Sequence, residues 1–144
     1  MTSVTGASLV SFFLACAGGI LLSALSGRKR APLVIAIVGT LSSLLMVLAS
    51  TTVLVTGQSY EASLWTLDGF GRLTVRLDAL SSIFLLAAGI VYFSVSIFVR
   101  NFIKDQLDDA YPTHRYGVLY FALMASVVLI LVASDAPLLS LIHI

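Results

Sequence analysis

The chain has 144 residues, of which 59% are hydrophobic and only 10% charged, and its formal net charge is +1. Too few polar side chains are available to cover the core of a soluble protein of this size, so the composition argues against a soluble fold. A net charge near zero, with the basic residues confined to short loop segments, also gives no reason to expect a nucleic-acid partner.

Four long apolar runs make up most of the sequence, and each is about as long as a helix that crosses the hydrocarbon core of a bilayer. None of the charged residues lies in the middle of a run. We therefore predict an all-α polytopic membrane protein with four transmembrane helices. The predicted spans are residues 7–25, 33–55, 79–99 and 116–133, within a single membrane domain of residues 1–138.

The first run could instead be a cleaved signal peptide, but such a peptide carries its basic residues before the apolar stretch. Here Arg28, Lys29 and Arg30 follow the stretch, so we expect a retained helix. Cys16 is the only cysteine, which excludes an internal disulfide, and we expect it to be a small packing residue. Pro32 suits the first turn of the second helix, where its missing N–H would have no partner anyway.

Small residues recur every four positions on the first helix, at Ser11, Ala15, Gly19 and Ser23. A face without bulk lets a neighbouring backbone approach closely. We predict that this face meets another helix, in ordinary packing rather than in a ligand site.

The positions of Lys and Arg predict the orientation, because basic loops beside membrane spans stay on the cytoplasmic side. The loop of residues 27–31 holds three basic residues and no acidic one, so it is the strongest signal, whereas the three basic residues of the loop of residues 100–115 are offset by Asp105, Asp108 and Asp109. The longer loop between the second and third runs has two basic residues against three acidic ones. We therefore expect the N-terminus to lie outside.

The loop between the second and third runs contains a pattern typical of a strand. Residues 72–78 alternate polar with apolar, which is the period of a half-buried strand, and Asp68-Gly69 before them favours a turn. Tyr60 and Trp65 suit a membrane interface. We predict a short extracellular β-element between helices 2 and 3.

Neither the loops nor the spans supply a recognisable active site. In the third loop we expect a short surface helix near residues 102–107, ending before Pro112, and a solvated surface position for His114 beside Arg115. No spacing of Cys, His and carboxylates resembles a metal site, and no nucleophile and base can be paired. We predict no catalytic, cofactor-binding or metal-binding residues and no cofactor.

A proton or ion pathway would need carboxylates or lysines inside the spans, and the four runs contain neither. Asp78 and Asp135 come closest, at the outer ends of the third and fourth helices. We expect Asp78 to cap the third helix by accepting from its first free N–H groups.

Residues 70–84, FGRLTVRLDALSSIF, resemble the segment that enters the third helix in the large antiporter-like membrane subunits of complex I and its relatives. That family shows an aromatic-rich strand, then Asp, a small residue, Leu and Ser, and then Phe within the helix. Residues 123–136, LMASVVLILVASDA, resemble its fourth helix and the turn before its fifth. The chain is most similar to hydrogenase-4 component B and the formate hydrogenlyase membrane subunit, and next to NADH-quinone oxidoreductase and multisubunit sodium/proton antiporter subunits.

The resemblance implies a proton-translocating subunit of a respiratory or hydrogenase complex, coupled to electron transfer in a peripheral arm and without a redox centre of its own. Its partners would be the lipid bilayer and other membrane subunits, in a bacterial or archaeal inner membrane. The family's working residues are a glutamate in the fifth helix and lysines in later helices. We therefore expect this chain to be an N-terminal fragment that is not catalytic by itself.

Residues 139–144, LSLIHI, are expected to be a non-native tail from a truncated reading frame. They are the translation of CTG TCT CTT ATA CAC ATC, a string that begins a transposase adapter used in library preparation, so His143 would have no functional meaning. One alternative is a complete four-helix accessory subunit that stabilises a larger assembly without transport chemistry. Another is a small four-helix exporter, which would need a membrane-embedded carboxylate that the first run lacks.

Overall fold

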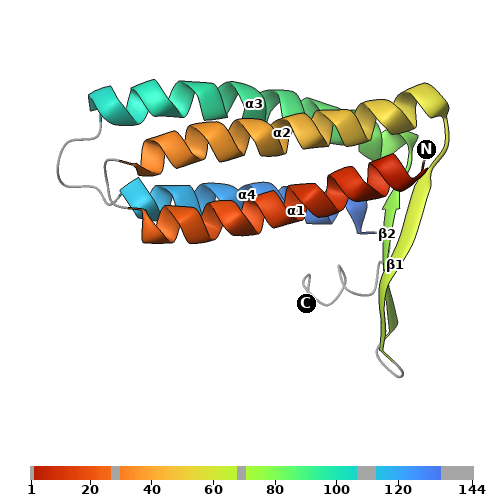
Figure 1. Cartoon of the computed structure of the whole chain (residues 1–144). Coiled ribbons are helices and arrows are strands. Elements are labelled where there is room, and N and C mark those ends of the chain that lie inside the picture. The colour runs from red at the N-terminus through yellow and green to blue at the C-terminus, as the bar shows by residue number, and fades with distance from the viewer. Residues whose placement is uncertain (1, 27–29, 68–70, 107–112, 134–144) are drawn as a thin grey trace, which may run out of the picture.

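The computed structural model describes residues 2–26, 30–67, 71–106 and 113–133, and it consists of four helices and one β-hairpin. The helices are α1 (Thr2–Leu25), α2 (Ala31–Thr56), α3 (Ala79–Gln106) and α4 (Thr113–Val132), and the strands are β1 (Tyr60–Leu67) and β2 (Gly71–Leu77). The helices lie side by side, and the hairpin lies across the end of the bundle where the chain begins (Figure 1).

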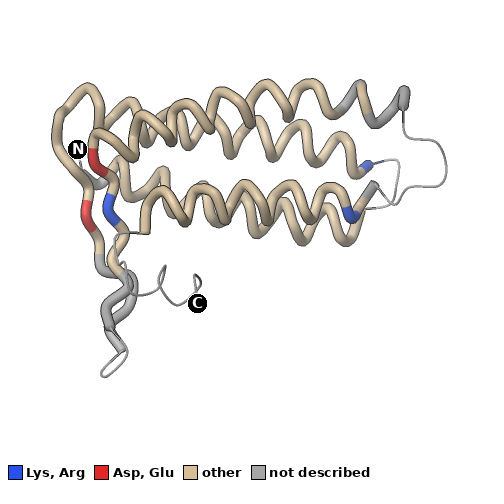
Figure 2. The backbone as a smooth tube through the Cα atoms, turned by 180° about the vertical axis from the view of Figure 1, so that it is seen from behind, with Lys and Arg blue, Asp and Glu red and all other residues tan. Residues whose placement is uncertain are grey.

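Each helix contains a segment long and apolar enough to cross a membrane. These segments are Val4–Leu25, Ala31–Thr56, Ala79–Val99 and His114–Val132. Large apolar side chains are exposed on every helix, and Leu14 and Leu119 are each 68% exposed. The described charged residues lie at the two ends of the bundle and not along it (Figure 2). The structure thus has the features of a multi-pass membrane protein with four candidate spans.

The helices extend beyond the predicted spans. Helix α1 begins at Thr2 instead of residue 7, and α3 continues to Gln106. The separate surface helix predicted near residues 102–107 is therefore wrong, because residues 102–106 are the last turns of α3. No Gly or Pro lies between Val99 and Gln106 to end the helix, so it runs on past the apolar span.

The ends of α2 follow from its sequence. Pro32 lies in the first turn, as predicted. Gly57 ends the helix with a φ of 65°, a left-handed conformation that favours glycine, and its N–H donates to the carbonyl of Val53 at 2.9 Å.

The helices alternate in direction and form one core. Helix α1 packs against both α2 and α4, and α2 also packs against α3, whereas α3 and α4 contact each other less. A single cluster of buried side chains draws on all four helices and on β2. It includes Phe12, Met46, Leu77, Leu85 and Phe121.

The hairpin confirms the predicted β-element between helices 2 and 3. Its strands are antiparallel, with Tyr60 opposite Leu77 and an irregular register between Ser63 and Trp65. The alternation predicted for β2 also holds, because Val75 and Leu77 are buried and Arg76 is exposed. Strand β1 was not predicted, and the predicted turn at residues 68–69 lies outside the described residues.

Two contacts attach the hairpin to the bundle. The Tyr60 ring lies against Gly6 of α1, where a Cβ would come 2.5 Å from the Tyr60 hydroxyl. On the other strand, Val75 pairs with Ala133, directly after α4, in an isolated antiparallel bridge. The hairpin thereby joins the beginning of the first helix to the end of the fourth.

The predicted small-residue face of α1 is confirmed only in its second half. A Cβ on Gly19 would come 2.8 Å from the Phe121 ring, and Ser23 lies against Gly117, so both positions meet α4. Ser11, however, is exposed. A helix has 3.6 residues per turn, so a four-residue spacing drifts by about 120° between residues 11 and 23.

We expect Gly19→Leu to destabilise the bundle and Gly18→Leu to be tolerated. The first substitution forces a side chain into the Phe121 ring, and overpacking of this kind costs about 1–3 kcal/mol. A Cβ on Gly18 has no atom within 4 Å, so the neighbouring glycine is a matched control. Thermal unfolding of both variants in detergent, followed by circular dichroism, measures the difference. Equal midpoints would contradict the close approach of α1 and α4.

Candidate functional site

The most developed polar cluster inside the bundle joins α3 to α4. The Tyr120 hydroxyl of α4 lies 2.7 Å from the Ser96 Oγ of α3, and each of the two oxygens also contacts the carbonyl of Tyr92. Ser96 donates to this carbonyl at 2.7 Å and Tyr120 at 3.1 Å. Ser96 is fully buried and Tyr120 nearly so.

Each hydroxyl has one hydrogen, so only two of the three contacts can be hydrogen bonds at one moment. Tyr120 can donate to Ser96 while Ser96 donates to the Tyr92 carbonyl, Ser96 can donate to Tyr120 while Tyr120 donates to that carbonyl, or both hydroxyls can donate to the carbonyl. In each arrangement both hydrogens are used. The cluster is therefore satisfied internally and needs no further partner.

A glycine on α2 makes room for this cluster. A Cβ on Gly39 would come 2.5 Å from the Ser96 Oγ and 3.2 Å from the Tyr120 ring. The ring also packs edge-on against Tyr92, with centroids 5.7 Å apart, and stacks with Tyr116 at 6.4 Å. Three helices thus fix the position of one tyrosine hydroxyl.

Further polar side chains are buried in the bundle without a satisfied hydrogen bond. Cys16 of α1 is 1% exposed, which confirms it as a packing residue, and its thiol interacts with Ser42 of α2. The Ser42 hydroxyl makes no hydrogen bond of standard geometry among the described residues. The same is true of two other fully buried hydroxyls, Ser23 and Ser82.

This chemistry suits cohesion between helices. Hydroxyls and a backbone carbonyl are neutral at physiological pH, and neither can act as the carboxylate or amine of a proton pathway. No group of three His, Cys, Asp or Glu side chains in the described part of the chain could hold a metal ion.

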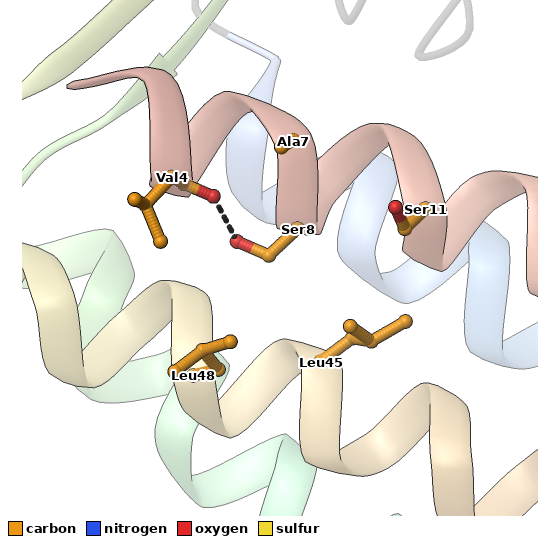
Figure 3. A pocket seen from close by; sticks show the side chains of 6 residues that line it. All are labelled: Val4, Ala7, Ser8, Ser11, Leu45 and Leu48. Carbon is orange, nitrogen blue, oxygen red and sulfur yellow. Dashed lines mark hydrogen bonds between the residues drawn. The ribbon is translucent and has the colours of Figure 1, made fainter. Parts of the chain in front are cut away.

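An apolar groove lies between α1 and α2. It has a volume of about 510 Å³ and opens to the side of the bundle. Figure 3 shows its lining: Val4, Ala7, Ser8 and Ser11 from α1, and Leu45 and Leu48 from α2. The Ser8 hydroxyl donates to the carbonyl of Val4 at 2.7 Å, so it offers little to a ligand. The surface of the groove is therefore mostly apolar.

Asp78 has the capping role predicted from its position. Its Oδ1 accepts from the N–H of Ser81 at 2.8 Å, in the first turn of α3. The Ser81 N–H lowers the pKa of the carboxyl below its ordinary value, and the nearby Arg76 acts in the same direction.

The other residues singled out in the sequence lie at the ends of the bundle. His114 is half-buried in the first turn of α4, which departs from the predicted solvated position, and Arg115 beside it is exposed. Asp135 lies outside the described residues. The Tyr120 cluster was not predicted, because its members are separated by up to 28 positions in the sequence.

No family model matches the chain, and no curated protein matches it.

Asp78→Ala should destabilise the protein by about 1 kcal/mol at pH 7, since the N–H of Ser81 loses its acceptor. The folded-state pKa of Asp78 is lowered, so its contribution is complete above the unfolded value near 3.8 and is lost as the pH falls through the folded value. Unfolding midpoints of wild type and variant should therefore converge at low pH. Asp78→Asn is the control, because Asn also caps helices but does not titrate there. A constant difference across this pH range would count against the charge-assisted cap.

We expect Tyr120→Phe to cost about 0.5–1.5 kcal/mol of stability, within the range for hydrogen bonds between membrane helices. The loss should be modest because Ser96 still donates to the Tyr92 carbonyl, so no buried donor is left unpaired. Tyr116→Phe is the matched control, since the Tyr116 hydroxyl makes no hydrogen bond within the described residues. Chemical unfolding in mixed micelles measures both variants. A control as destabilised as Tyr120→Phe would rule out the cluster as the cause.

Proposed function

We propose that this chain is the N-terminal membrane part of a proton-translocating subunit in a respiratory or hydrogenase complex of the hydrogenase-4 or complex I-like type. In this role the chain contributes scaffold helices, and the proton is carried by residues of other helices. The setting is the inner membrane of a bacterium or archaeon, with the N-terminus outside. The partners are the lipid bilayer and other membrane subunits.

The observation that carries the proposal is the absence of carboxylates and lysines from the described spans. The described spans contain no Asp, Glu or Lys, and His114 and Arg115 lie in the first turn of α4, at the end of a span. A proton pathway through hydrocarbon depends on ionisable side chains facing the bundle interior. A bundle without them suits a scaffold that borders such a pathway.

The local structure around Asp78 supports the family resemblance. Strand β2 ends at Leu77, Asp78 caps the next helix, and α3 begins at Ala79. This is the order of strand, Asp, small residue and helix found in the resembled segment.

The exposed faces of α3 and α4 support packing against further membrane helices. Helix α4 contacts mainly α1, which leaves Leu119 and Leu123 exposed. On α3 the large aromatic side chains Phe84 and Phe98 are exposed. In a larger subunit these faces would meet either lipid or neighbouring spans.

A second candidate function is that of a complete accessory subunit without transport chemistry. The observation that favours it is the single core shared by all four helices and β2. Such a core makes the four helices one packed unit, which could stabilise a larger assembly by itself.

Sequencing the source DNA across the codons for residues 133–144 and the next few hundred bases separates the two candidates. We expect the frame to continue into a fifth helix that contains a Trp-Glu pair. A genuine stop after residue 144 would instead favour the accessory subunit.

Proton flux tests the assignment of a scaffold role directly. The purified chain in liposomes that contain a pH-sensitive dye should release protons no faster than empty liposomes, because the described spans hold no Asp, Glu or Lys. A protonophore added at the end of each run shows that the vesicles were sealed. Flux at the rate of a complete antiporter would refute the scaffold role.

A further inference from the structure

The apolar groove between α1 and α2 is followed along α2 by a smaller hollow, at the end of the bundle where the hairpin lies (Figure 1). The groove has a volume of about 510 Å³. The hollow has a volume of about 200 Å³ and is lined by Thr51, Thr52, Val55 and Thr56. Leu48 of the groove precedes Thr51 and Thr52 by three and four positions, so the groove and the hollow share one face of α2.

The sizes of the side chains explain why a groove forms here. The α1 side of the groove carries the small residues Ala7, Ser8 and Ser11. Leu45 and Leu48 of α2 point toward them (Figure 3). Because the small side chains do not fill the space in front of the leucines, Leu48 remains 47% exposed.

The groove and the hollow lie at the depth of one lipid leaflet. Their lining residues belong to the candidate spans Val4–Leu25 and Ala31–Thr56. Leu45 precedes Thr56, the last residue of its span, by eleven positions, or about 16.5 Å of helix. One leaflet contributes about 15 Å to the hydrocarbon core. The two depressions therefore follow the helix axis through about one leaflet, in the direction in which acyl chains run.

Polarity changes along this path. The deeper part is mostly apolar, and the part at the end of the span is lined by three threonines. Thr51, Thr52 and Thr56 each donate at 2.7 Å to a carbonyl one turn earlier in α2. Their oxygens keep lone pairs that can accept a hydrogen bond. A hydrocarbon surface that ends in hydrogen-bond acceptors matches a phospholipid, whose acyl chain ends at a polar headgroup.

The size of the groove favours an acyl chain over a protein. Val4 and Ser11 are seven residues apart, or about 10.5 Å of helix, which gives the groove a mean cross-section of about 50 Å². A helix with its side chains is about 10 Å across, or about 80 Å² in section. A stable protein interface takes roughly 20–30 residues on each side, whereas six residues line this groove. The groove is thus too narrow for a helix and too small to hold a second copy of the chain.

We propose that the groove between α1 and α2 binds one acyl chain of a phospholipid, whose headgroup lies at the threonine-lined hollow. The site goes beyond the proposed scaffold role, which needs no particular lipid. It requires only that the spans are inserted in a bilayer.

Photo-cross-linking of the full chain in phospholipid vesicles tests the site without any substitution. The probe is phosphatidylethanolamine with a diazirine in one acyl chain, and mass spectrometry of peptides locates the cross-links. The reference is the exposed face of α4 at Leu119 and Leu123. We expect roughly threefold more cross-links on residues 4–11 and 45–56 than on this reference.

Variants that fill the groove provide a second measurement. Ala7→Leu/Ser11→Leu adds bulk on the α1 side, and the matched control Ala17→Leu/Ala24→Leu adds it at two exposed positions that do not line the groove. Circular dichroism verifies that each variant is folded, and native mass spectrometry from micelles counts the phosphatidylethanolamine retained. The filled variant should retain roughly tenfold less than wild type, and the control as much as wild type.

Three results would overturn the proposal. Equal cross-linking on the groove and on α4, or equal retention by the filled variant and wild type, would reduce the lipid to bulk solvent. A wild-type dimer that the filled variant abolishes would assign the groove to a second copy of the chain. Extraction of the chain from the vesicles by alkaline carbonate would overturn both the site and the membrane setting of the proposed function.

Discussion

The close approach of helices at glycine is the interaction on which this bundle depends. Lipid chains are as apolar as leucine, so burial of apolar surface alone does not drive helices together in a membrane, and tight packing has to do so. Gly19 lets α1 receive the Phe121 ring, Gly39 lets α2 receive Ser96, and Gly89 brings α3 onto α2. The contacts of α1 with α4 and of α2 with α3 thus contain positions where a Cβ would meet a neighbouring atom.

The lipid environment also explains the hydrogen bonds that the Ser and Thr hydroxyls make. With no water to accept their hydrogens, most Ser and Thr side chains donate to a carbonyl one turn earlier in their own helix, as Thr52 does to Leu48 and Ser94 to Ile90. Tyr120 is different, because its hydroxyl reaches across to Tyr92 and Ser96 on another helix. It supplies a directional bond where the helix contact is less extensive, between α3 and α4.

Local features of the fold could be predicted from sequence, and long-range ones could not. Asp78, Pro32 and the alternation of β2 act within a few residues, so their roles as cap, first-turn residue and strand are visible in the sequence. The Tyr120 cluster depends on which helices are neighbours. The sequence does not determine this, because each apolar helix could pack against its neighbours through several of its faces. The prediction for Ser11 was wrong because residues four positions apart on a helix do not lie on one straight face. Each step of four turns about 40° around the axis, so Ser11 lies away from the face that meets α4.

The distribution of charge limits where chemistry can occur in this protein. Described charges lie at the ends of the bundle, and the interior holds neutral hydroxyls. A hydroxyl chain relays a proton only if it continues at both ends to groups that exchange protons. The chain from Tyr120 through Ser96 ends instead on the Tyr92 carbonyl, which has no proton to release. The cluster therefore links α3 to α4 by hydrogen bonds that are satisfied within the bundle.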